Sequence, residues 1–171
     1  MGEGEYTIME IAEFVKNKRS FKNIKGIYFR DDKGNIVKTS PAETIKDLDK
    51  LPFPAYHLVD LKKYVPLPHH YKRLPAINVV TARGCSWGQC TFCCESIRLG
   101  HYRRMSPKRV IDLLKILSNT YGIKEISFWD DLFTIPPKWV NEFCDKIIKR
   151  KLDIKWDCQS RVNATAIDLE I

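Results

Sequence analysis

The chain has 171 residues, of which 44% are hydrophobic and 29% are charged. These proportions are those of an ordinary globular domain, and they exclude a disordered tail, a low-complexity polymer and a small disulfide-rich scaffold. No apolar run approaches the roughly 20 residues that a membrane-spanning helix needs. The net charge of +8 favours acidic partners, but the basic residues are dispersed, so nucleic-acid binding has little support.

The chain has six cysteines, and whether they form disulfides depends on the redox state of the compartment in which the protein resides. The amino terminus, Met1-Gly2-Glu3-Gly4-Glu5, is acidic, whereas a secretory signal begins basic and continues apolar. We therefore expect a reducing, cytoplasmic compartment, in which clustered thiols bind metal or react more often than they pair as disulfides.

The first 40 residues predict one helix followed by one hairpin. A capping box formed by Thr7 and Glu10 predicts a helix that starts at Thr7. Its apolar positions recur at helical spacing, and they are Ile8, Ile11, Phe14 and Val15. Two short β-rich runs, 26–30 and 35–38, flank a loop that contains Gly34, which is the pattern of a β-hairpin.

Residues 40–75 contain six prolines, which block continuing helices, so we expect an extended connector with one short helix around 58–64. From residue 76 the pattern becomes a regular alternation of strands and helices. In order, the expected elements are strand 77–81, a helix from Ser106 to Gly122, strand 125–129, a helix opened by Pro136 and Pro137, and strand 154–158.

This alternation predicts an α/β fold in which the three strands form a parallel sheet with right-handed crossovers. A parallel sheet is normally covered on both faces, and three strands with two helices leave one edge and one face bare. The sequence therefore reads as part of a larger domain, and we expect a fragment.

The strongest functional signal is a cluster of three cysteines directly after the first of these strands. Cys85, Cys90 and Cys93 have the spacing Cys-x4-Cys-x2-Cys, so three thiolates can converge on one soft metal centre. Gly84 and Gly88 provide the tight backbone that such a loop needs. Three unrelated buried cysteines would have little reason to lie so close together.

Three kinds of metal site are compatible with this spacing. A structural zinc ion needs a fourth ligand, for which the candidates are Cys94, Cys144, Cys158 and His101. A plant-type ferredoxin also uses a later fourth cysteine, which completes a two-iron cluster. Three thiolates on a four-iron cluster would instead leave one iron open for a ligand, as catalytic metal centres do. By their apolar register, Cys144 and Cys158 read most simply as small core residues.

The segment from Cys85 to Cys93 resembles the cluster-binding loop of the radical S-adenosylmethionine (radical SAM) superfamily, although the usual spacing there is Cys-x3-Cys-x2-Cys. The longer spacing is similar to that of the cobalamin-binding subgroup. The family also has similar segments at the positions that correspond to residues 102–107, 128–133 and 156–162 of this chain, and upstream at those that correspond to residues 2–5 and 47–54.

The resemblance implies a fold and a division of the chain. The fold would be a partial (β/α)6 radical SAM barrel, truncated after about three strands and preceded by a small α+β linker region. Residues 1–75 would be the tail of a cobalamin-binding domain with its linker, and residues 76–171 the amino-terminal part of the radical SAM core. Such a chain is expected to bind its cluster poorly and to turn nothing over, because barrel sites draw residues from several strands.

The resemblance also implies the ligands and their binding residues. Cys85, Cys90 and Cys93 would hold a 4Fe-4S cluster, and the methionyl group of S-adenosylmethionine would occupy the fourth iron. The resemblance also implies individual contacts with S-adenosylmethionine. Phe92 would lie near its adenine, Asp130 or Asp131 would bind its ammonium, and Ser160 and Arg161 would bind its carboxylate or ribose. Each has an ordinary alternative, which is loop packing, a solvated turn or surface ion pairing.

The implied activity is reductive cleavage of S-adenosylmethionine to a 5′-deoxyadenosyl radical, which abstracts hydrogen from a substrate that the sequence does not identify. A reductant such as flavodoxin or ferredoxin would supply the electron. If cobalamin acts in the full-length protein, methyl transfer or another carbon-centred radical reaction follows.

The competing classes of function are a ferredoxin-like electron carrier, a zinc-stabilised binding module and a basic nucleic-acid module. For the last, His69 and His70 are candidates, but a solvated linker explains them more simply.

Overall fold

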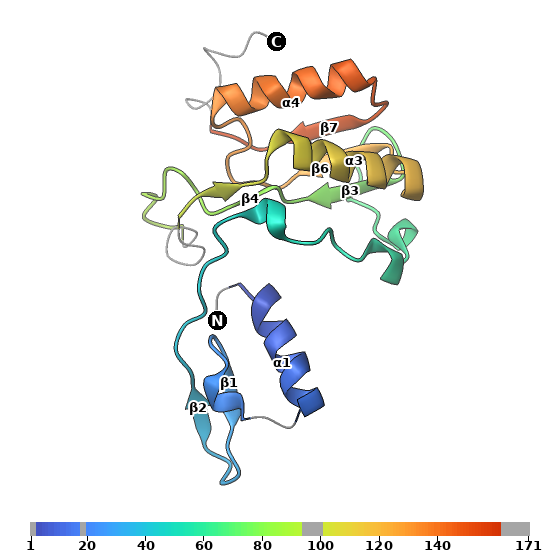
Figure 1. Cartoon of the computed structure of the whole chain (residues 1–171). Coiled ribbons are helices and arrows are strands. Elements are labelled where there is room, and N and C mark those ends of the chain that lie inside the picture. The colour runs from blue at the N-terminus through green and yellow to red at the C-terminus, as the bar shows by residue number, and fades with distance from the viewer. Residues whose placement is uncertain (1–2, 18–19, 94–100, 162–171) are drawn as a thin grey trace.

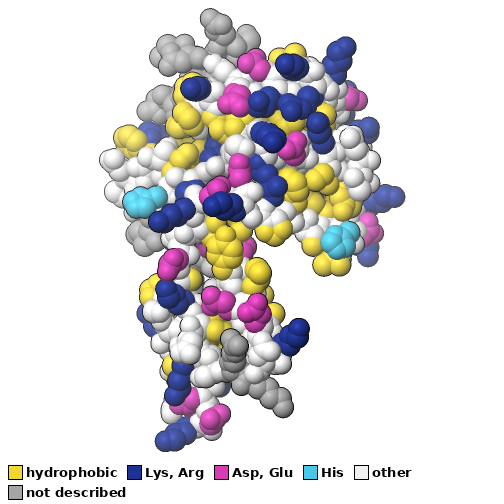
Figure 2. Space-filling model, in the orientation of Figure 1, with side chains coloured by type: hydrophobic (Ala, Val, Ile, Leu, Met, Phe, Trp, Pro, Cys, Tyr) yellow, Lys and Arg dark blue, Asp and Glu magenta, His cyan; other side chains and the backbone are white. Residues whose placement is uncertain are grey.

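The computed structural model describes residues 3–17, 20–93 and 101–161. Figure 1 shows two parts, a small amino-terminal lobe with helix α1 (Glu5–Asn17), the 3₁₀ turn η1 (Phe21–Asn23) and a hairpin, and a larger sheet lobe. In Figure 2 a narrow waist joins the two lobes, and Lys and Arg side chains are scattered over both. No helix in the described part of the chain is long and apolar enough to cross a membrane.

Helix α1 begins two residues before the predicted start. Its first turn is closed by a hydrogen bond of 2.8 Å from Ile8 N to Gly4 O, so Thr7 lies inside the helix and the predicted capping box is wrong. The Thr7 hydroxyl instead donates to Lys25 O at 3.3 Å. The expected apolar stripe is only partly covered, because no described residue of α1 is buried and the Val15 side chain is 66% exposed.

The predicted hairpin is confirmed, with strands β1 (Tyr28–Arg30) and β2 (Ile36–Lys38) paired antiparallel. Asp31 closes the turn, because its Oδ1 accepts hydrogen bonds from Lys33 N at 3.0 Å and from Asn35 N at 2.8 Å. Gly34 has a φ of +82°, a left-handed conformation that glycine adopts without a steric penalty.

The connector contains three single-turn 3₁₀ helices, η2 (Leu48–Lys50), η3 (Tyr56–Leu58) and η4 (Leu61–Lys63). The sequence predicted one short helix around 58–64, whereas the structure has the two turns η3 and η4 in this region. The connector packs onto the sheet lobe through a small apolar cluster, whose buried members are Ile45, Leu48 and Leu51 with Met105 against them. It therefore belongs structurally to the larger lobe from about Ile45 onward.

The predicted parallel sheet is confirmed, with the strand order β3 (Ala76–Val79), β6 (Glu125–Phe128) and β7 (Lys155–Cys158). Helices α3 (Pro107–Tyr121) and α4 (Pro137–Arg150) lie between the strands in sequence and pack on each other. The expected boundaries of α3 are also found. Ser106 Oγ accepts from Arg109 N at 3.1 Å, and Gly122 ends the helix with a φ of +68°.

The two faces of the sheet differ sharply. One face packs against α3 and α4 in a core of fully buried side chains, among which are Leu114, Ile126, Phe128, Phe133 and Phe143. The opposite face carries polar side chains, Asn78, Ser127 and Asp157, of which Asn78 and Asp157 are exposed. Ser127 Oγ donates to Asp157 Oδ1 at 2.7 Å on this second face. No helix of the described residues covers this polar face, and the connector borders it at Asn78.

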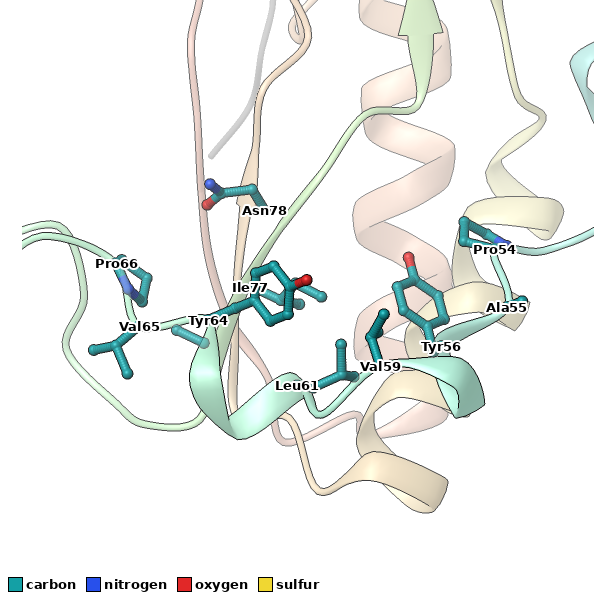
Figure 3. Close-up of a pocket in the computed structure, with 11 residues that line it drawn as sticks. Pro54, Ala55, Tyr56, Val59, Leu61, Tyr64, Val65, Pro66, Ile77 and Asn78 are labelled. Atoms are coloured by element: carbon teal, nitrogen blue, oxygen red, sulfur yellow. The ribbon is translucent and has the colours of Figure 1, made fainter. Parts of the chain in front are cut away.

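A groove of about 520 Å³ runs between the connector and the edge strand β3 (Figure 3). Its walls are mainly apolar: Tyr56, Leu61 and Tyr64 come from the connector, while Ile77 and Asn78 come from β3. None of the residues that line it is a cysteine, so this groove is separate from the cysteine segment.

Candidate functional site

The predicted cluster ligands lie on a loop that follows β3 and the short strand β4 (Ala82–Arg83). Strand β5 (Arg103–Arg104) returns from the loop and pairs antiparallel with β4, a pairing that the sequence did not predict. Cys85 is half-buried, and Cys90 and Cys93 are exposed. The loop turns at Gly84 and Gly88, both with positive φ, and Cys93 N donates to Cys90 O at 3.1 Å.

Within the described residues, no three His, Cys, Asp or Glu side chains converge as a metal site. The chemistry of the donor set nevertheless fits an iron–sulfur cluster, because three soft thiol ligands lie on one solvent-accessible loop with two glycine turns. Cys94 lies outside the described residues. Cys144 and Cys158 pack against the core, and burial raises the pKa of both thiols, as expected for small core residues.

Asp130 anchors the approach to the cysteine loop. Its carboxylate is 1% exposed, and Oδ1 accepts from Thr81 N at 2.5 Å and from Ala82 N at 2.9 Å. Oδ2 accepts from the Thr81 hydroxyl and from Arg104 Nη2, the latter at 3.3 Å. Both oxygens are therefore occupied by the chain itself, which holds the backbone between β3 and β4 against the end of β6.

Arg104 completes this anchor from the other side of the cysteine loop. Its side chain is only 5% exposed, and its Nη1 donates to Phe133 O at 2.5 Å and to Ile135 O at 2.7 Å. The guanidinium also stacks over the Trp139 ring, 3.3 Å from the centroid. Burial lowers the pKa of Arg104, and the nearby Asp130 carboxylate opposes that shift. The pair thus joins three separate segments in one buried network.

The other predicted cofactor contacts lie around the carboxyl ends of the strands. Asp131 is exposed at the end of β6, and the Phe92 ring is 92% exposed on the cysteine loop. The Arg161 guanidinium lies over the Trp87 ring at 4.1 Å from its centroid, so the end of β7 reaches the cysteine loop. Ser160 is hydrogen-bonded to the hydroxyl of the buried Thr134.

An acidic pair from the start of the chain contacts both strands that flank the cysteine loop. Glu3 Oε1 accepts from Arg83 Nη1 at 2.8 Å, and Glu3 Oε2 accepts from Arg103 Nη1 at 2.8 Å. Glu5 accepts from the other terminal nitrogen of Arg83. Ile45 also takes part, since its N–H donates to Glu3 Oε2 at 2.6 Å and its carbonyl accepts from Arg103 Nη1 at 2.6 Å. We call Glu3, Glu5, Arg83 and Arg103 the clasp.

The clasp is expected to make stability sensitive to acid. Burial by itself raises the pKa of Glu3, but hydrogen bonds from Arg83, Ile45 N–H and Arg103 outweigh it, so the pKa lies below the ordinary 4.5. A lowered folded-state pKa stabilises the fold above 4.5, and this stabilisation is lost as the pH falls through the lower value. Urea unfolding should show a larger loss of stability between neutral pH and pH 3 in the wild type than in Glu3→Gln. Parallel pH dependences in the two proteins would contradict this assignment.

The sequence predicted the cysteine loop and named Asp130 and Arg161 as candidate site residues, but it did not predict the contacts that hold the loop. The Asp130–Arg104 network, the clasp and the Trp87–Arg161 stack join residues 26 to 100 positions apart. One signal was available, namely that Glu3 and the Arg103-Arg104 pair occur in segments noted for their family resemblance. What each residue contacts required the tertiary structure.

Comparison with known proteins identifies relatives across nearly the whole chain, although no family model matches it. The chain is 37% identical to an uncharacterized methyltransferase of Pyrococcus horikoshii over 95% of its own length and 34% of that protein. It is 30% identical to the anaerobic magnesium-protoporphyrin IX monomethyl ester cyclase of Rubrivivax gelatinosus, over 94% of the chain and 29% of the cyclase.

Among solved structures, the cobalamin-dependent S-adenosylmethionine radical enzyme OxsB superposes with a TM-score of 0.70 and 27% identity. The match covers 94% of this chain and 22% of that one. The chain therefore spans about a third or less of the length of these relatives. Over nearly its whole length the chain therefore matches part of a radical SAM enzyme of the cobalamin-dependent group.

Proposed function

We propose that the chain is the cluster-binding portion of a radical SAM enzyme. Cys85, Cys90 and Cys93 would hold a 4Fe-4S cluster whose fourth iron takes the methionyl group of S-adenosylmethionine. Such a cluster, when bound and reduced, supplies the electron for reductive cleavage of the sulfonium bond to give a 5′-deoxyadenosyl radical. The chain's own residues would fix the loop, bind the cofactor and exclude water.

The observation that carries this proposal is the meeting of three strand ends at one loop. β3 leads through β4 into Cys85, Asp130 and Asp131 follow the end of β6, and the residues after β7 place Arg161 over Trp87 on the loop. Ligand sites of parallel α/β folds lie at the carboxyl ends of their strands. A cofactor held on the cysteines would therefore lie within reach of side chains from all three strands.

Each neighbouring side chain then has a proposed task. Asp131 is the better candidate than Asp130 for the cofactor's ammonium, since Asp131 is exposed and Asp130 is buried in a network within the protein. Arg161 and Ser160 would bind the carboxylate or the ribose hydroxyls, for which a guanidinium offers charge-assisted donors. Phe92, on the exposed part of the loop, would pack against the adenine ring.

The larger architecture is part of the same proposal. The three-stranded sheet would be the first half of a partial (β/α)6 barrel, with residues 76–171 in that barrel and residues 1–75 as the tail and linker of a cobalamin-binding domain. A flavodoxin or ferredoxin would be the reductant. The relatives include a methyltransferase and a cyclase, which supports methyl transfer with cobalamin or another carbon-centred radical reaction. They give no support to a ferredoxin-like carrier or a zinc module.

Anaerobic reconstitution with iron and sulfide tests this function directly. The purified chain should take up iron and sulfide in equal amounts, with about four of each per polypeptide as the upper limit because a partial barrel is expected to bind its cluster poorly. Addition of S-adenosylmethionine should change the electron paramagnetic resonance spectrum of the reduced cluster, because the cofactor binds an open iron. Protein that holds a two-iron cluster, zinc alone or no metal would exclude the radical SAM proposal.

A further inference from the structure

The clasp joins the two ends of the cysteine loop to the start of the chain. Arg83 precedes Cys85 by two residues and Arg103 follows the loop, so each arginine marks one end of the segment that carries the thiols. Glu3 binds both arginines through a single carboxylate, with Arg83 Nη1 at 2.8 Å and Arg103 Nη1 at 2.8 to 2.9 Å from its oxygens. One side chain therefore bridges strands β4 and β5 from outside the sheet lobe.

Burial makes these contacts matter more than ordinary surface ion pairs. The side chains of Glu3 and Arg103 are 6% and 10% exposed, and that of Arg83 is 25% exposed. Charge-assisted hydrogen bonds shielded from water are stronger than exposed ones, and the loss of one partner leaves the other charge desolvated. The clasp also contacts the connector, because Ile45 N–H donates to Glu3 Oε2 at 2.6 Å.

We propose that Glu3 is a positioning residue for the cysteine loop. It holds β4 and β5 together and couples the loop to the amino-terminal lobe, with Glu5 adding a second contact to Arg83. Its negative charge also offsets the two arginines that flank the thiols, so Glu3 contributes to the reduction potential of the cluster that the loop carries. This second effect rests on the proposed function, whereas the coupling of the strands does not.

Loss of the Glu3 charge is expected to shift the reduction potential of the cluster in one direction. The potential of an iron–sulfur cluster depends on the charge and hydrogen bonding around it, and nearby negative charge disfavours addition of an electron. Replacement of Glu3 by the neutral, similarly shaped glutamine leaves the charges of both arginines less compensated. The midpoint potential of the cluster is therefore expected to shift to a more positive value.

The test compares wild type with Glu3→Gln in two measurements. In the metal-free chain, hydrogen exchange of the β4 and β5 amides should accelerate by about tenfold or more in the variant, since hydrogen bonds to charged groups are lost. After reconstitution, the variant should hold less iron per chain, and its remaining cluster should have the more positive midpoint potential. The β6 amides should keep the wild-type rate, which shows that the sheet lobe is still folded.

The matched control is Glu13→Gln, which removes the same charge from an exposed position on α1 and should behave as wild type. Glu5→Gln, which loses one contact to Arg83, should give a smaller effect in the same direction, and it replaces Glu3→Gln if that variant does not fold. The proposal would be overturned if Glu3→Gln had the same amide exchange rates, iron content and midpoint potential as Glu13→Gln. Faster exchange with unchanged iron content and potential would overturn the role toward the cluster. If wild type takes up no iron, the proposed function fails while the exchange measurement still tests the coupling of β4 and β5.

Discussion

Replacement of Asp130 by asparagine is expected to lower the free energy of unfolding by about 3–5 kcal/mol, the usual cost of removing one partner from a buried ion pair. The side chains of Asp130 and Arg104 are 0% and 5% exposed, so the Arg104 guanidinium would remain desolvated without its counter-charge. The asparagine amide would also present a donor where the carboxylate accepts from Thr81 and Ala82. Urea unfolding of the metal-free chain measures the loss.

An exposed ion pair in the same chain provides the control. Asp153 Oδ1 lies 2.7 Å from Arg73 Nη1, but its side chain is 78% exposed. Solvent screens such a pair, so Asp153→Asn should leave the free energy of unfolding nearly unchanged. If Asp130→Asn destabilised the chain no more than Asp153→Asn does, Asp130 would not be the anchor of the cysteine loop.

This prediction separates two adjacent carboxylates that the sequence could not tell apart. Both aspartates follow the second parallel strand, where a cofactor-binding carboxylate was expected. Alternation along the strand places Asp130 on the buried side with Ile126 and Phe128, and its burial is nearly complete. A buried carboxylate must be neutralised by the protein, and Arg104 does so. Asp131, which is exposed, keeps the ligand role as a proposal.

The strands and helices of the sheet lobe could be predicted because their signals are local. Apolar periodicity, the Ser106 cap and the Gly122 stop all lie within one element or directly beside it, and all three are found in the structure. The predicted start of α1 also rests on a local signal, but that prediction was wrong. A capping box at Thr7 is a valid local pattern, but the backbone hydrogen bond from Ile8 to Gly4 starts the helix earlier.

The contacts that fix the cysteine loop could not be predicted because they join distant segments. Arg103 and Glu3 are 100 residues apart, and Asp130 and Thr81 are 49 residues apart. The apolar periodicity of one segment carries no information about which distant segment it contacts. The sequence showed only a charge in each segment, and a charge by itself is most often solvated. Burial separated these charged residues from the many Lys and Arg side chains on the surface.

Both networks act on the same stretch of backbone but from opposite sides. Asp130 and Arg104 hold it to the ends of the sheet, and Glu3 holds it to the amino-terminal lobe. Of the three thiols between them, that of Cys85 is half-buried and those of Cys90 and Cys93 are exposed. The two networks thus fix both ends of the segment that carries the thiols, and the backbone turns at Gly84 and Gly88 lie within that segment.

Replacement of Cys85, Cys90 or Cys93 by alanine, one at a time, is expected to remove the iron from the reconstituted chain. Loss of a residue that merely orients a metal ligand typically weakens metal binding by about 10- to 100-fold, so loss of a ligand itself should cost more. A cluster with three protein ligands needs each of them. Iron and sulfide analysis after desalting should give values close to background for all three variants.

The decisive comparison is with the cysteines that pack against the core. A four-iron cluster with an open iron requires three thiols, whereas a zinc site or a two-iron cluster requires a fourth protein ligand. Cys144 and Cys158 are half-buried, and burial raises the pKa of both thiols, which disfavours the thiolate that a metal needs. Cys144→Ala and Cys158→Ala should therefore retain wild-type iron content and the spectral response to S-adenosylmethionine. If either lost its metal along with the three loop variants, the site would have four protein ligands, and the open coordination position on which the radical reaction depends would not exist.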